Sequence, residues 1–390
     1  MTVKKETKAG LPALAERVTG AAILLDASPR TWTSVEEINY RLSRILSAQG
    51  INVVLVYAGL SPEHRQRFEE AGARVEILGY GKRRYRYFRE LRRIFRENSI
   101  SLVHVSFFDY FSLVPWLVRL NGVTRIVYEE LNSGMTNATG WKRKLLQLRT
   151  AITSWPMSRV IAVSEFVKND LVKRGFAAED IIVRYLAADE QKFKPDPDAR
   201  KKWVEEYSIE PDELIMSSVT LLRPFKSPET LVETAALLAQ RRVRARLFMA
   251  GDGAMLKDLK ELGNKLEVSD RIHWLGFCKD PRSLLQASDV FLLASVGEAG
   301  GFVLSEAMGC GTPIVGSASG VIAECVDDGK TGLLATPKNA NSFADAIEKL
   351  ARDPSLLQSM RIRSRERMLK YFTVDIHVHN TVAVYQSLFG

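Results

Sequence analysis

Short apolar, β-branched segments alternate with helical patterns along almost the whole chain, and this alternation restricts the possible folds more than any other feature. The apolar segments predict strands, and stretches between them, such as residues 35–50, predict helices. Strands that alternate with helices form parallel sheets covered on both faces. The sequence therefore predicts an α/β protein. The predicted strands are residues 21–25, 52–57, 74–78, 102–106, 124–129, 159–164, 214–219, 245–251, 271–276, 289–294, 313–316 and 331–335.

The strand series divides at residues 188–203, which are polar, contain two prolines and have little hydrophobic period. We interpret this segment as a linker between two doubly wound domains of similar size. A chain of 390 residues is long enough for two or three domains. Ligands of such sheets bind beyond the carboxyl ends of the strands, so we expect a cleft between two facing domains. The predicted boundaries are 1–195, 196–374 and a final helix at 375–390 that packs back on the N-terminal domain.

Composition fits a globular protein with a sizeable core, at 46% hydrophobic and 26% charged residues. The three cysteines match no zinc or redox spacing and give no sign of a disulfide framework. No run of about 18 apolar residues predicts a membrane span, and residues 107–120 are better interpreted as a buried helix. The first 20 residues lack the apolar core of a secretory signal. We expect a cytoplasmic protein, with peripheral attachment to the inner face of the plasma membrane as a further hypothesis.

The net charge of +9 is unevenly distributed. Residues 82–96 contain eight basic residues and one acid, and apolar residues recur among them at a helical period. One interpretation is a solvated helix that packs its aromatic side chains inward. The other is a surface for anionic lipid headgroups or an anionic acceptor. The apolar residues of this segment are Tyr85, Phe88, Leu91 and Phe95, and Trp141, Lys142, Arg143 and Lys144 form a second basic and aromatic cluster.

Two acids bracket a predicted junction of strand, glycine loop and helix. Glu298 and Glu306 are eight residues apart, with Gly300 and Gly301 between them, and a helical pattern follows at 302–308. The unpaired amides and positive dipole end of a helix N-terminus attract anions. This arrangement suits a sugar nucleotide, with its phosphates on the helix N-terminus and its hydroxyls on the carboxylates.

Residues 290–339 resemble the signature of the retaining glycosyltransferases of family 4, which have the GT-B fold of two facing Rossmann-like domains. Glu298 and Glu306 match the two acids of that signature. The resemblance implies that Glu298 contacts the donor sugar and Glu306 the ribose hydroxyls. The loop of Gly300 and the amides of Gly301, Phe302 and Val303 would then face the diphosphate. The other matching residues are Gly311, Pro313, Gly320, Glu324, Gly329 and Gly332.

Residues 217–238 also resemble the family, in its first strand, basic loop and helix of the second domain. By that resemblance Arg223 and Lys226 neutralise the donor diphosphate and stabilise the leaving nucleotide. The family often carries its arginine where this chain has Leu221, so Arg223 is a substitute for that role. Backbone groups near Gly276 and Phe277 would receive the base.

The first domain resembles the family only in outline, through residues 160–176 and 181–193. Asp189 stands where the family often has an aspartate near the cleft. The usual double-glycine loop is replaced by residues 26–37, which contain no glycine. His104 and Ser106 stand where the family often has two histidines, and a lone histidine such as His104 is more often a satisfied core residue. These three residues are the acceptor-side candidates.

Two patterns resemble metal sites but lack the context for one. Asp196 and Asp198 lie in the proline-bearing linker with no preceding strand, and His377 and His379 are two apart, so in a helix they do not share a face. We therefore expect no metal and no cofactor besides the nucleotide sugar, and no nucleic-acid partner.

The resemblance implies metal-independent transfer of a sugar, with retention, from a nucleotide-diphosphate sugar to a carbohydrate or lipid-linked acceptor. The leaving phosphate would help to deprotonate the acceptor. The basic segment at 82–96 favours an anionic or membrane-bound acceptor, as in bacterial cell-envelope polysaccharide, lipopolysaccharide or glycolipid synthesis. Two alternatives stay open: a catalytically silent sugar-nucleotide-binding or scaffold protein of the same fold, and a GT-B sugar-nucleotide epimerase.

Overall fold

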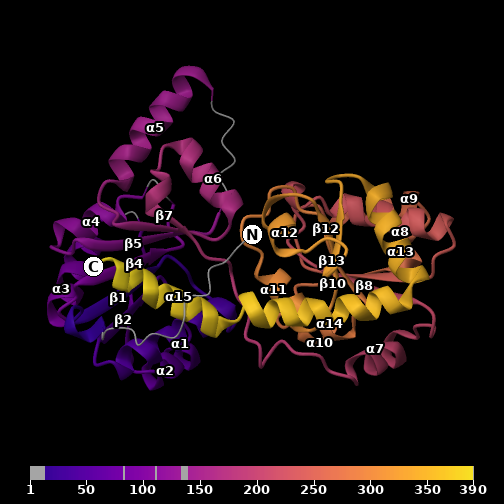
Figure 1. The fold of residues 1–390 in the computed structure, drawn as a ribbon, viewed down its shortest axis with the longest axis horizontal. Coiled ribbons are helices and arrows are strands. Elements are labelled where there is room, and N and C mark those ends of the chain that lie inside the picture. Colours follow the sequence, from indigo (N-terminus) through magenta and orange to yellow (C-terminus); the bar gives the residue numbers. More distant parts are fainter. Residues whose placement is uncertain (1–13, 82–83, 110–111, 133–138, 390) are drawn as a thin grey trace.

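The first of the two α/β lobes is built on a sheet of seven parallel strands (Figure 1). We analysed a computed structural model, which describes residues 14–81, 84–109, 112–132 and 139–389. The strand order is β3-β2-β1-β4-β5-β6-β7, so β1 pairs with both β2 and the central β4. The strands are β1 (Gly20–Leu25), β2 (Asn52–Tyr57), β3 (Ala73–Ile77), β4 (Leu102–Ser106), β5 (Arg125–Glu130), β6 (Arg159–Ala162) and β7 (Ile181–Val183).

Helices cover both faces of this sheet, and successive residues of β1 alternate between two hydrophobic clusters. Ala22 and Leu24 face the cluster under α3, α4 and α6, whereas Ile23 and Leu25 face the cluster under α1, α2 and α15. Burial on both faces explains why the strands are continuous apolar segments. The helices are α1 (Ser34–Ala48), α2 (Pro62–Glu70), α3 (Arg84–Glu97), α4 (Val114–Leu120), α5 (Gly140–Ser154), α6 (Glu165–Arg174) and α15 (Val374–Ser387).

The second lobe repeats the design with six parallel strands in the order β10-β9-β8-β11-β12-β13. Its strands are β8 (Leu214–Val219), β9 (Ala245–Ala250), β10 (Ile272–Gly276), β11 (Val290–Leu293), β12 (Ile314–Ser317) and β13 (Gly332–Ala335). Its helices are α7 (Ala199–Tyr207), α8 (Pro228–Gln240), α9 (Leu256–Lys265), α10 (Arg282–Ala287), α11 (Phe302–Gly309), α12 (Gly320–Cys325), α13 (Ala340–Arg352) and α14 (Pro354–Tyr371). The predicted α/β architecture with two parallel sheets is confirmed.

The chain passes between the lobes twice, and the two crossings pair with each other. Ala188 accepts from Val374 N–H at 3.2 Å and donates to Phe372 C=O at 3.0 Å. The first crossing follows β7, and the second joins α14 to α15 (Figure 1). Helix α15 then packs into the first lobe, where Val378, Val382 and Tyr385 are buried in the cluster with α1.

Two boundaries differ from the sequence-based expectation. The predicted linker through residue 203 is wrong beyond 198, because α7 begins at Ala199 and its Trp203 is buried in the second lobe. The helix predicted at 107–120 is shorter, because α4 begins only at Val114 and Phe107 has a left-handed φ of 64°. Residues 110 and 111 lie outside the described residues.

The basic helix α3 packs an apolar face into the core, and this face differs in part from the one expected from the sequence. Leu91 and Phe95 are buried as expected, together with Tyr87 and Ile94, but Tyr85 is exposed. Among the described residues, no helix combines the length and the apolar character needed to cross a membrane.

Candidate active site

The loop between β11 and α11 ends at a helix N-terminus whose N-cap residue has no side chain to cap it. Gly301 occupies the N-cap with a φ of +66°, a left-handed conformation that glycine adopts without strain. A glycine cap offers no side-chain oxygen to the first amides of α11, and the first turn contains no acid. The amides of Phe302 and Val303 are therefore in a position to bind an anion.

Glu298, the acid predicted to contact the donor sugar, lies in this loop and forms an ion pair with Lys226. Lys226 Nζ donates to Glu298 Oε2, and both side chains are nearly buried, at 15% and 10% exposed. Lys226 ends a short 3-10 turn that follows β8. Val296 N–H donates to Phe225 C=O at 2.8 Å, which fixes this turn against the Glu298 loop. Two segments 72 residues apart thus bring a cation and a carboxylate together beside the N-terminus of α11.

The backbone of Glu298 is held by the glycine turn that follows β12. Val321 N–H donates to Glu298 C=O at 2.9 Å. Gly320 lies so close that a Cβ there would be 2.3 Å from Glu298 O, and its φ is +58°. Gly297 N–H donates to Ser319 Oγ at 3.1 Å. This turn therefore fixes the position of the acid.

Glu306 lies one turn along α11 and meets the first lobe. Its Oε1 accepts a hydrogen bond from Ser34 Oγ at 3.2 Å. Burial raises the pKa of Glu306 to about 7, and the hydrogen bond from Ser34 offsets only part of that rise. Ser34 is the first residue of α1, which the capping box of Thr33 and Glu36 holds in place. Sequence reasoning assigned no role to Ser34.

The remaining donor-side candidates lie at the carboxyl edge of the second sheet. Arg223 precedes the turn of Lys226, and its side chain is exposed. Gly276 ends β10 with a φ of +66°, and its carbonyl accepts from Gly251 N–H at 2.7 Å. Phe277 follows and is 71% exposed. Backbone and ring are thus accessible at the site where the resemblance places the base.

Gly300 and Phe302 mark where the lobes touch. A Cβ on Gly300 would lie 2.5 Å from Leu186 Cδ1, so only glycine fits without a shift. The ring of Phe302 packs against hydrophobic clusters of the first lobe, whereas Val303 packs in the second. Ser164 Oγ donates to Ala299 C=O at 2.6 Å across the same contact.

A second contact between the lobes centres on Glu324 of α12. Its carboxylate accepts from the amides of Glu165 and Phe166 at 2.9 and 2.8 Å, and from Tyr185 Oη at 2.9 Å. These amides begin α6, so an acid of one lobe caps a helix of the other. The sequence motif identified Glu324 but not this role.

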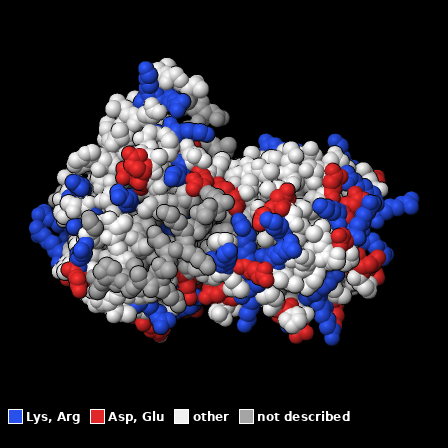
Figure 2. Space-filling view, in the orientation of Figure 1, with Lys and Arg blue, Asp and Glu red and all other residues white. Residues whose placement is uncertain are grey.

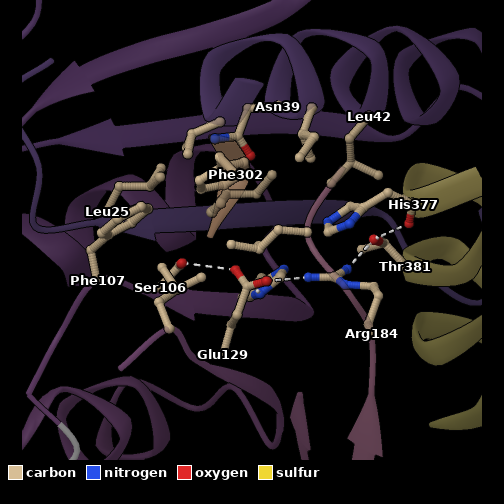
Figure 3. Close-up of a pocket in the computed structure, with 16 residues that line it drawn as sticks. Leu25, Asn39, Leu42, Ser106, Phe107, Glu129, Arg184, Phe302, His377 and Thr381 are labelled. Atoms are coloured by element: carbon tan, nitrogen blue, oxygen red, sulfur yellow. Dashed lines mark hydrogen bonds and ion pairs between the residues drawn. The ribbon is translucent and has the colours of Figure 1, made fainter. Parts of the chain in front are cut away.

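His104 and Ser106 belong to a buried polar network at the carboxyl edge of the first sheet (Figure 3). Ser106 Oγ donates to Glu129 Oε2 at 2.8 Å, and His104 Nδ1 lies 2.7 Å from Tyr385 Oη. Arg184 donates to both Glu129 and Thr381. Sequence reasoning missed Glu129, Arg184, Thr381 and Tyr385, which come from three separate parts of the chain.

The network lines a cavity of about 30 Å³ that Phe302 also borders (Figure 3). That volume holds little more than a water or two and is too small for a sugar ring. Burial opposes ionisation of Glu129, but the Arg184 guanidinium, together with His104 and His377, outweighs it and holds the pKa of Glu129 well below its usual range. A buried ion pair that is also bonded to Ser106 and Thr381 fits a scaffold that holds the ends of β4, β5 and α15 together.

Asp189, the third acceptor-side candidate, is already occupied by structural contacts. Its Oδ1 accepts from Arg41 Nη2 at 2.9 Å and from the amide of Gln191 at 2.9 Å. Arg41 also pairs with Glu37, Glu190 and Asp375. The structure thus places Asp189 in an ion-pair cluster that links α1, the first crossing and α15.

The two metal-like patterns do not assemble into ligand sets. His377 is buried, with Nδ1 2.9 Å from Tyr185 O, and burial lowers its pKa to about 3, whereas His379 is exposed. Over the part of the chain that the structure describes, no three His, Cys, Asp or Glu side chains are grouped to hold a metal.

Comparison with known families covers both lobes. Residues 199–367 match the model of Glycosyl transferases group 1, and residues 35–192 match the model of Glycosyltransferase Family 4. The chain is 32% identical over 230 residues to N-acetyl-alpha-D-glucosaminyl L-malate synthase of Bacillus anthracis, covering 59% of each chain. It is 30% identical over 190 residues to a D-inositol 3-phosphate glycosyltransferase of Kribbella flavida, covering 46% of this chain and 45% of that one. The chain therefore spans about half the length of these curated relatives.

A solved structure extends the similarity to the whole fold. Anabaena HepE in complex with UDP and glucose superimposes with a TM-score of 0.79 at 19% identity, covering 95% of this chain and 100% of that one. With matches to both family models and this architecture, the chain belongs to the group 1, family 4 glycosyltransferases and has the GT-B fold.

Proposed function

We propose that this protein is a retaining, metal-independent glycosyltransferase that moves a sugar from a nucleotide-diphosphate sugar to an acceptor. The observation that carries the proposal is the Lys226–Glu298 pair beside the uncapped N-terminus of α11. Glu306 follows on the same helix. Cation, helix N-terminus and two carboxylates are the groups that a diphosphate, a sugar and a ribose require.

Donor binding would exchange the partners of Lys226 and Glu298. The sugar hydroxyls donate to Glu298, and the ammonium of Lys226 turns to the diphosphate, joined by the exposed Arg223. The bond from the anomeric carbon to the phosphate oxygen then breaks, and the acceptor oxygen bonds to the same face of that carbon. The acceptor proton passes to the leaving phosphate oxygen. Lys226, Arg223 and the α11 N-terminus stabilise the charge that develops on that phosphate.

The comparisons support a nucleotide-sugar donor. The HepE structure contains UDP and glucose. The names of two relatives include L-malate and D-inositol 3-phosphate, which are both anions. An anionic or lipid-linked acceptor in bacterial cell-envelope polysaccharide, lipopolysaccharide or glycolipid synthesis agrees with the net charge of +9.

Thermal-shift screening tests the donor site. The protein and its Glu306→Ala variant are heated with UDP, GDP, ADP, CMP and their common sugar conjugates. A ligand that binds only the folded state raises the melting temperature. We expect one nucleotide family to stabilise the wild type and not the variant. If none stabilises the wild type, the silent-scaffold alternative replaces this proposal.

Turnover tests the chemistry. With the donor so identified, proton NMR of the product reports the anomeric configuration, and the assay is run with and without EDTA. We expect the donor's configuration and an unchanged rate in EDTA. An inverted product, or loss of activity in EDTA that a divalent metal restores, would contradict the mechanism. A changed sugar without any acceptor would indicate an epimerase.

A further inference from the structure

Helix α5 projects from the first lobe (Figure 1), and large apolar side chains along it are exposed. Five large side chains recur along it at spacings of four, three, four and three residues, which places them in one stripe. Each is more than half exposed. They are Trp141 at 70%, Leu145 at 57%, Leu148 at 60%, Ile152 at 56% and Trp155, just beyond the helix, at 62%.

The buried residues of α5 are polar and its exposed stripe is apolar, which is the opposite of the usual arrangement in a surface helix. Thr150 and Thr153 are its buried residues. Thr153 Oγ1 bonds within the helix, to Arg149 C=O at 3.1 Å. A surface helix ordinarily buries its apolar stripe. Here the stripe faces solvent, and a contiguous exposed apolar face of this kind marks an interaction site.

The base of the stripe is firmly attached to α4. Trp116 Nε1 donates to Ile152 C=O at 2.9 Å, and its ring stacks on Trp155 with centroids 5.2 Å apart. The guanidinium of Arg119 lies 4.9 Å from the Trp155 ring. The apolar face is therefore presented on a supported helix.

The charge of α5 identifies what covers this face. Residues 140–154 contain Lys142, Arg143, Lys144 and Arg149 and no acid. Basic side chains gather at the tip of the projection (Figure 2). A second copy of this helix would place cations against cations, which disfavours self-pairing. Aromatic and aliphatic residues on one side and only cations beside them suit an anionic bilayer surface.

We infer that α5 docks this protein on anionic membrane surfaces, with the stripe Trp141, Leu145, Leu148, Ile152 and Trp155 entering the headgroup region. Helix α3 presents its apolar residues differently from α5. Arg93 of α3 pairs with Glu76, Glu90 and Glu97, and its apolar residues Leu91 and Phe95 lie in the core. The inference concerns the first lobe only and needs neither donor nor turnover.

Flotation with vesicles tests it. The full chain is mixed with vesicles of phosphatidylcholine alone or with phosphatidylglycerol added. We expect binding to the anionic vesicles and little to the neutral ones. Lys142→Gln/Arg143→Gln/Lys144→Gln should weaken binding about a hundredfold, at about 1 kcal/mol for each cation near the surface. Leu145→Gln/Leu148→Gln should weaken it at least about tenfold, because it removes two exposed leucines from the stripe.

Each variant has a matched control on another surface. Arg89→Gln/Arg92→Gln/Arg96→Gln removes the same charge from α3, and Ile362→Gln/Leu369→Gln removes two exposed apolar residues from α14. Both controls should bind as the wild type does. Absence of wild-type flotation, or α5 variants that float as well as the controls, would overturn the inference. So would sedimentation showing a dimer that Leu145→Gln/Leu148→Gln abolishes while flotation persists, since the stripe would then be a self-association surface.

Discussion

Lys226 and Glu298 form an ion pair between the turn after β8 and the loop that precedes α11. This pairing determines what each residue can do. Removing one partner of a nearly buried pair leaves the other charge uncompensated. On the proposed mechanism, the pair keeps two charges in a protected site until a substrate offers each a better partner. The proposed roles of Lys226 and Glu298 depend on this exchange of partners when the donor binds.

Replacing Lys226 by Met should lower kcat more than it raises KM for the donor. On the proposed mechanism the ammonium stabilises charge that develops on the leaving phosphate, and loss of one such donor costs about 10²–10³ in rate. Steady-state kinetics measures the split. Lys330→Met is the control, because Lys330 is exposed and its one ion pair among the described residues is with Asp327, at 3.3 Å. A rise in KM with kcat unchanged would instead assign Lys226 to ground-state binding.

The raised pKa of Glu306 leads us to expect that the affinity for the donor depends on pH. Its raised pKa of about 7 means that the carboxyl is mostly protonated at pH 6 and mostly ionised at pH 8. The ionised form offers both oxygens as charged acceptors to the ribose hydroxyls, whereas protonation turns one of them into a donor. Affinity for the nucleotide sugar should therefore rise about tenfold between those pH values, because ionised Glu306 rises from about a tenth to nearly all of the population. Calorimetry of wild type against Glu306→Gln checks this, and an equal slope in the variant would exclude Glu306 as its source.

At the scale of elements, two glycine turns allow the cost of a strained backbone to be distinguished from the cost of a steric clash. Gly320 and Gly329 both have positive φ, of 58° and 74°. A Cβ at Gly320 would clash with the backbone of Glu298, whereas at Gly329 nothing lies within 4 Å. Gly329→Ala should therefore cost about 1–2 kcal/mol of unfolding free energy from the left-handed backbone alone.

Gly320→Ala should cost clearly more and should also impair donor binding, because the turn must move away from Glu298. Thermal unfolding and nucleotide binding of the two variants check this. Equal losses of stability with unchanged binding in both would contradict the idea that this turn positions the acid.

The elements themselves were largely predictable from sequence, because each buried parallel strand is a local apolar run. Residues 52–57 and 102–106 were predicted to the residue, as β2 and β4. The boundaries of α4 and α7 were not. The polar start of α7 resembles a loop, and its Trp203 becomes buried only through contacts with distant strands. The orientation of α5 was not predictable either, since periodicity places residues on one face without saying which way it points.

At the scale of the whole molecule, Glu324 links the two lobes by capping α6. Glu324→Ala removes three hydrogen bonds and exposes the α6 amides, at a cost of about 1–3 kcal/mol. We expect small-angle scattering to give a larger radius of gyration for this variant. Tyr185→Phe removes one bond and should change it less, and the exposed Glu366→Ala should not change it. An unchanged radius in Glu324→Ala would show that other contacts hold the lobes together.

The parts of the site that could not be predicted from the sequence depend on contacts between distant parts of the chain. Glu298 and Glu306 stand in one short motif and were identifiable. Ser34 meets Glu306 from 272 residues away, and the network around Glu129 draws on Arg184, directly after β7, and on Thr381 of α15. No local pattern marks such residues, because their partners are distant in the sequence and meet only in the folded chain.

The central claim is that the Lys226–Glu298–Glu306 set at the N-terminus of α11 binds a nucleotide diphosphate. Titration calorimetry of the nucleoside diphosphate that stabilises the protein, against wild type, Lys226→Met, Glu306→Ala and the Lys330→Met control, tests it most directly. We predict one site in the wild type and the control, weaker binding in Lys226→Met and none in Glu306→Ala. Equal binding in all four proteins, or none in the wild type, would contradict the claim.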